Sequence, residues 1–116
     1  LNMNLNDKQL EYLKNAPNFE EHLQQKLQDA DFQKQWLELS LQEFLNDGNI
    51  DYFVQTLTKV VKSRGRGEIK RLAEVSDIDR GNLSEILNGK ITPRIDTAIK
   101  LIRGLGYECD IKLKSA

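Results

Sequence analysis

The stretch over residues 72–89 constrains the fold most, because a helical pattern of apolar residues breaks in its middle and then resumes. The apolar residues on the two sides of the break are Ile69, Leu72 and Ala73, then Leu83, Ile86 and Leu87. The break contains the turn-forming pair Ser76 and Asp77, and Asp79 stands where a helix N-cap is expected. Asn88 and Gly89 supply a stop signal. The pattern predicts two short helices across a tight turn, which is a helix-turn-helix unit.

The start of the second predicted helix carries side chains that can read DNA bases, because such a helix fits the major groove with its first residues against base edges. Arg80 can donate two hydrogen bonds to guanine, and Asn82 can pair with adenine. Glu85 can accept from cytosine, and Ser84 is placed nearer the DNA backbone. We predict base reading by these four residues. The alternative is a solvated helix face.

Basic residues surround the ends of the same predicted helices. Unpaired backbone N–H groups near Glu68 and Ile95 would favour phosphates there. The residues predicted to contact phosphates are Arg64, Arg66, Lys70, Arg71, Lys90 and Arg94. As a group they would supply affinity that falls with salt, whereas for any single residue an exposed charge without a role is an equal alternative.

Residues 72–89 resemble the DNA-binding segment of the Cro/repressor-type helix-turn-helix regulators, and residues 93–106 resemble the helix that follows it. Together with the upstream helix that ends in SRG and the closing LGYECDIKL, the chain is similar to the HigA-like antitoxins. The resemblance implies a lambda-repressor-like domain that represses its own operon, and a HigB-like, RNA-cleaving toxin as partner. Two residues depart from the family pattern: Asp77 replaces the usual turn glycine, and Gly81 replaces a polar residue of the recognition helix.

Charge divides the chain unevenly. Residues 1–52 contain four basic and ten acidic residues, a net charge of -6, whereas residues 53–116 contain 13 basic and eight acidic residues, a net charge of +5. The division predicts two partners of opposite charge, one of them nucleic acid. Chance variation in a short chain is the alternative.

The sequence predicts an all-α fold with three parts. These are an acidic helical region over residues 1–50, a helix-turn-helix domain over 51–106 and a strand over 107–116. Pro17 interrupts a short first helix around Leu10 and Leu13, and the helical pattern then continues to Leu45 with a joint near Asp29. Residues 32–45 could pack on the DNA-binding domain as a core helix. Alternatively, residues 10–27 could form an acidic arm for a basic toxin.

The last residues alternate with a period of two, which is typical of a strand. The apolar members are Tyr107, Cys109, Ile111 and Leu113. Nothing else in the chain has a strand pattern, so we expect the strand to pair with a second copy or with the edge of a toxin sheet. A homodimer would present two recognition helices to a palindromic operator. A frayed tail is the alternative.

Other classes of protein find little support in the sequence. No apolar run approaches a membrane span and no signal peptide is recognisable, so a cytoplasmic protein that does not engage membranes is expected. His22 and Cys109 have no neighbours at the spacing of a metal or catalytic site, so no cofactor, metal or enzyme activity is expected. Two alternatives to an antitoxin are a stand-alone, phage-repressor-like regulator and an interaction module that has lost DNA binding.

Overall fold

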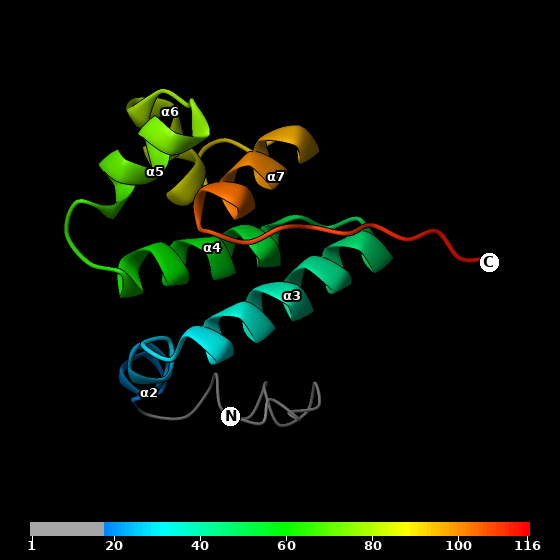
Figure 1. The fold of residues 1–116 in the computed structure, drawn as a ribbon, viewed down its shortest axis with the longest axis horizontal. Coiled ribbons are helices and arrows are strands. Elements are labelled where there is room, and N and C mark those ends of the chain that lie inside the picture. Colours follow the sequence, from blue (N-terminus) through cyan, green and yellow to red (C-terminus); the bar gives the residue numbers. More distant parts are fainter. Residues whose placement is uncertain (1–17) are drawn as a thin grey trace. The chain divides into compact units, whose positions relative to one another are not determined.

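The computed structural model describes residues 18–116 and is helical throughout the regular parts of that range (Figure 1). The helices are α2 (Phe19–Lys26), α3 (Ala30–Asp47), α4 (Asp51–Ser63), α5 (Glu68–Ser76), α6 (Arg80–Leu87) and α7 (Ile95–Gly104). The predicted all-α class is confirmed for this range. The helix predicted around Leu10 and Leu13 and much of the arm predicted over 10–27 lie outside the described residues. None of the described helices combines the length and apolar character that crossing a membrane requires.

The chain divides into two compact units, with unit 1 ending at Arg66 and unit 2 beginning at Gly67. Helix α4 packs against α3 and so groups with the preceding helices, whereas the sequence had suggested a boundary before it. The described part of unit 1 carries six basic and eight acidic residues, and unit 2 carries nine and eight. The net charges are therefore -2 and +1, and they differ less than the net charges of -6 for residues 1–52 and +5 for residues 53–116.

Unit 1 is built on the pairing of α3 with α4. Asp29 caps α3, since its Oδ1 accepts from the backbone N–H groups of Asp31 and Phe32 at 2.8 and 3.2 Å, which confirms the predicted joint. The buried core of the two helices includes Phe32, Trp36, Leu37, Phe53, Leu57 and Val60. The residue type of Asp51 suits a helix N-cap, but its side chain does not cap α4. Asp51 is the first residue of the helix, and its own N–H donates to Asn49 Oδ1 at 2.9 Å.

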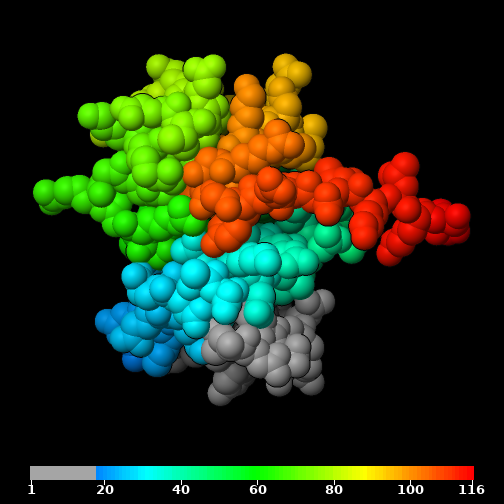
Figure 2. Space-filling model, viewed as in Figure 1, coloured from blue at the N-terminus to red at the C-terminus, as the bar shows by residue number. Residues whose placement is uncertain are grey.

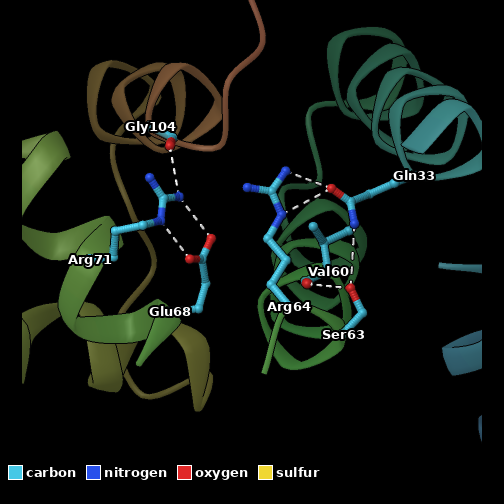
Figure 3. Close-up of polar contacts among 7 residues, drawn as sticks. All are labelled: Gln33, Val60, Ser63, Arg64, Glu68, Arg71 and Gly104. Atoms are coloured by element: carbon cyan, nitrogen blue, oxygen red, sulfur yellow. Dashed lines mark hydrogen bonds and ion pairs between the residues drawn. The ribbon is translucent and has the colours of Figure 1, made fainter. Parts of the chain in front are cut away.

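The end of α4 is held by glutamine side chains. Gln33 is buried, and its Nε2 donates to Leu27 O at 3.2 Å. The same Nε2 also donates to Ser63 Oγ at 3.4 Å, and Gln33 Oε1 accepts from Arg64 Nη2 at 2.6 Å and Nε at 3.1 Å (Figure 3). Gln28 Nε2 donates to Ser63 O at 2.9 Å. Gln28 thus satisfies a backbone carbonyl at the end of α4, where the helix would otherwise fray, while Gln33 holds the side chain of Arg64. Arg64 is therefore part of the internal structure of unit 1.

Unit 2 contains α5, α6 and α7, with α5 in contact with both other helices. The side chains buried in it include Leu72, Ala73, Leu83, Ile86, Ala98 and Leu101. Helices α5 and α7 approach closely at Gly104, where an added Cβ would lie 2.7 Å from Leu72 Cδ1. Ser76 Oγ donates to Lys100 O at 3.3 Å beside this contact. A small residue at 104 is thus a condition of the packing.

The strand predicted over residues 107–116 is absent from this structure, in which these residues have no regular secondary structure. A strand requires a neighbour to satisfy its backbone donors and acceptors, and no strand occurs elsewhere among residues 18–116. Ile111 and Leu113 are exposed, and the last residues are drawn in red in Figure 2. Pairing with another chain stays a prediction.

Candidate nucleic-acid interface

The turn between α5 and α6 has the geometry that its residues predict. Asp77 ends α5 in the left-handed conformation, with φ 54° and ψ 49°, which a glycine would adopt without strain. Asp79 caps α6, because its Oδ2 accepts from the backbone N–H of Asn82 at 3.0 Å. The predicted N-cap is confirmed. Asn88 ends the helix and Gly89 follows with φ 76°, as expected from the stop signal.

Helix α6 has one buried and one exposed face. Leu83, Ile86 and Leu87 are buried, so the register of the helix is fixed by its apolar side. The exposed face carries three of the four predicted base readers, Arg80, Asn82 and Glu85, while Ser84 is half-buried. Within residues 18–116, the side chains of Arg80, Asn82 and Glu85 take part in no hydrogen bond or ion pair. Their polar groups are available to a partner.

An open hollow of about 410 Å³ lies beside the turn between the two helices. Its lining residues are Lys70, Ala73, Glu74, Asp77, Ile78, Asp79 and Arg80. Two cations and three carboxylates therefore meet at the start of α6. The carboxylates would repel phosphates, so a nucleic acid at this face would approach through the cations and the exposed side of α6.

The residues predicted to bind phosphate fall into two groups. Lys70, Lys90 and Arg66 are exposed, and so is Arg94, although its Nε lies 3.3 Å from Asp96 Oδ1. Arg64 and Arg71 instead use their guanidinium groups within the protein. Arg64 binds Gln33, as described, and Arg64 and Arg66 belong to unit 1 whereas the other four belong to unit 2.

Arg71 is bound within unit 2 by a carboxylate and a carbonyl (Figure 3). The hydrogen bond from its side chain to Glu68 raises the pKa of Arg71, against the lowering effect of burial. Arg71 Nη2 also donates to Gly104 O at 3.0 Å. Sequence reasoning missed Glu68 and Gly104 as partners. The spacing of three residues between Glu68 and Arg71 was a signal for the first contact, but nothing local pointed to the second.

The predicted interface residues of the tail differ in exposure. Tyr107 and Cys109 are half-buried, whereas Ile111 is 52% and Leu113 is 98% exposed. Burial raises the pKa of the Cys109 thiol, with Arg103 lowering it and Asp110 raising it to smaller extents. No cluster of three His, Cys, Asp or Glu side chains that could hold a metal ion occurs in residues 18–116.

Comparison with known proteins identifies the class. The family model described as "Probable addiction module antidote protein" matches residues 24–113, which is most of the chain. The chain belongs to this family and is an antitoxin of a toxin–antitoxin module, so a toxin is its implied partner. Searches of curated proteins and of solved structures found no match.

Proposed function

We propose that this antitoxin represses its own operon by placing α6 in the major groove of operator DNA. The observation that carries the proposal is that Arg80, Asn82 and Glu85 are exposed and unengaged on a helix whose apolar side chains are buried. Arg80 and Asn82 carry the planar donor and acceptor groups that suit guanine and adenine. Ser84 would contact the DNA backbone. In this proposal α5 and α6 act together as a Cro-type helix-turn-helix unit.

Phosphate contacts in this proposal come from the basic residues without a structural task. Lys70 and Lys90 are exposed, and Arg94 can exchange its exposed partner Asp96 for a phosphate because a surface ion pair is weak. Arg66, which is exposed in unit 1, stays a predicted phosphate contact. Arg64 and Arg71 have a smaller direct role, because phosphate binding would require them to release Gln33 and Glu68.

The second activity in the proposal is neutralisation of a HigB-like, RNA-cleaving toxin by direct binding. The family membership implies a toxin, and the negative charge of the described part of unit 1 suits a basic partner. Exposed acidic residues such as Asp31 and Glu38 on α3 are available for this contact. Separate surfaces for toxin and DNA would allow one molecule to perform both tasks.

A mobility-shift assay on the chain's own promoter over a salt series tests the DNA activity. We expect Arg80→Ala to weaken operator binding by about 1–3 kcal/mol while binding to unrelated DNA changes little. Lys34→Ala removes an exposed cation on α3 and serves as the matched control. Equal binding by the Arg80→Ala variant and the wild type would remove α6 from the role of reader.

Co-expression with the product of the neighbouring reading frame tests the toxin activity. We expect the wild type and Arg80→Ala to restore growth equally, whereas a double variant Asp31→Lys with Glu38→Lys restores it less. Repression by the double variant should remain. A neighbouring product that is harmless, or one that this chain cannot neutralise, would contradict the proposed partner.

A further inference from the structure

The tail, residues 107–116, has two acidic residues followed by two basic residues, so its charge pattern read forwards is complementary to the same pattern read backwards. Glu108 and Asp110 are acidic, and Lys112 and Lys114 are basic. In an extended chain these four side chains lie on one face, because successive side chains alternate between faces. The opposite face carries the apolar residues from Tyr107 to Leu113.

A glycine and one backbone hydrogen bond fix how the tail leaves α7. Gly106 has φ 103°, and Tyr107 N–H donates to Ile102 O at 3.2 Å as the chain leaves the helix. Within the described chain, no backbone hydrogen bond involves residues 108–116. Ile111 and Leu113 are exposed at 52% and 98%. The backbone of residues 108–116 and the side chains of Ile111 and Leu113 are therefore available to another strand.

We propose that the tails of two copies of this chain pair as antiparallel strands about a twofold axis at Ile111. In this register Glu108 lies opposite Lys114 of the second copy, and Asp110 lies opposite its Lys112. Symmetry repeats both contacts, so four pairs of opposite charge line one face. On the other face, Ile111 meets Ile111 and Cys109 meets Leu113 of the second copy, which covers the exposed apolar side chains.

The alternatives in register are less favourable. A shift that moves the axis by one residue places either Asp110 against Asp110 or Lys112 against Lys112, which is repulsive. A shift of the pairing by an odd number of residues places charged side chains opposite apolar ones, so the charged faces of the two tails no longer match. Parallel pairing in register sets all four charged residues against themselves. The antiparallel register about Ile111 satisfies every charge.

The same order of charge indicates that the strand that pairs with the tail is the tail of a second copy of this chain. A foreign sheet edge would need to supply a matching pattern, whereas the tail already contains its own complement. This association does not depend on binding of DNA or toxin. It deepens the proposed function, because a twofold dimer would present two α6 helices to a palindromic operator.

Sedimentation of the full chain in the absence of DNA tests the charge pattern. An acidic variant, Lys112→Glu with Lys114→Glu, and a basic variant, Glu108→Lys with Asp110→Lys, should each raise the dimer dissociation constant by about tenfold or more. Mixing the two should restore dimers. A fourfold variant that exchanges all the signs is the matched control and should dimerise as the wild type does. A monomeric wild type, or acidic variants that still dimerise fully, would overturn the proposal.

Cysteine crosslinking tests the register separately. In a Cys109→Ser background, Ile111→Cys should form an intersubunit disulfide under mild oxidation, because the residue opposes itself across the axis. Asp110→Cys and Lys112→Cys in the same background are the controls and should crosslink much less. Faster crosslinking through position 110 or 112 would contradict the register, and capture of a toxin strand without tail-to-tail crosslinking would contradict the assigned occupant.

Discussion

Arg71 holds Glu68 through two parallel hydrogen bonds, from Nε to Oε1 at 2.6 Å and from Nη2 to Oε2 at 2.8 Å. Glu68 is the first residue of α5 and is 7% exposed. The same guanidinium reaches the carbonyl of Gly104 at the end of α7. Arg71 thus links the start of one helix to the end of another, which is a task quite different from contacting a phosphate.

Arg71→Gln should therefore lower the free energy of unfolding by about 1–3 kcal/mol, because it leaves a largely buried carboxylate without its main partner. Thermal unfolding followed by circular dichroism measures the loss. Lys70→Gln is the control, since Lys70 is the exposed neighbour. It should change stability by less than about 0.5 kcal/mol and, if DNA binding is as proposed, reduce the salt slope by about 1. Equal destabilisation by the two variants would contradict this assignment.

Two glycines within helices of unit 2 should respond to alanine in opposite ways. At Gly104 the new Cβ would collide with Ser76 Oγ and lie 2.7 Å from Leu72 Cδ1, so we expect a loss of about 1–3 kcal/mol in unfolding free energy. At Gly81 the nearest atom is the terminal Asp79 Oδ2 at 3.2 Å. Because this atom also caps α6, it can shift only slightly, so we expect a gain smaller than the roughly 1 kcal/mol that helix propensity alone would give. Urea unfolding of both variants checks the contrast, and a stable Gly104→Ala protein would refute the close packing of α5 and α7.

The left-handed Asp77 predicts the effect of substitutions in the turn. Asp77→Gly should be at least as stable as the wild type, because glycine adopts this conformation without steric strain. Asp77→Val should be less stable than the glycine variant by about 1–2 kcal/mol, since a β-branched side chain is unfavourable there. Denaturant midpoints of the two variants measure the difference. If the valine variant matched the glycine variant, the turn would have another conformation.

The Cys109 thiol should titrate above the range of an ordinary thiol, because burial raises its pKa. In the pH interval between the unfolded and folded values, the unfolded thiol is ionised while the folded thiol is still protonated. The contribution of the protonated Cys109 thiol to folding stability is therefore fully present below the unfolded pKa, and it is lost as the pH rises through the folded pKa. Alkylation rates measured against pH, with the urea-unfolded chain as reference, report both values. Arg103→Gln removes a nearby cation and should raise the folded pKa further. An apparent pKa at or below that of the unfolded chain would contradict the burial of this thiol.

Sequence reasoning succeeded where the physical cause is local. The N-cap at Asp79 and the stop at Asn88 depend on residues within a few positions of the helix ends, and both are present. The start of α4 is harder to place from the sequence, because Asn49 and Asp51 are both residue types that cap helices, whereas the helix begins at Asp51 after Ile50.

The candidate site was less predictable where distant residues decide the role of a side chain. Arg64 and Arg71 were assigned to phosphate contact because they are basic and lie near helix ends. Gln33 lies 31 residues before Arg64, and Gly104 lies 33 residues after Arg71, so neither contact is visible from local pattern. The strand was predicted from alternation alone, but a strand also needs a neighbour, and residues 18–116 of one chain do not supply one.

The amide contacts of Gln24, Gln28 and Gln33 have a consequence for the behaviour of α4. Helix ends normally exchange their amide hydrogens rapidly, because the last turn opens without disturbing the rest. Here opening the end of α4 would also break bonds from α2, from α3 and from the segment between them, among them Gln24 Nε2 to Lys59 O at 3.3 Å and Gln28 Nε2 to Ser63 O at 2.9 Å. Carboxamides do not titrate near neutral pH, so this protection should persist across the physiological pH range and end abruptly at Gly65.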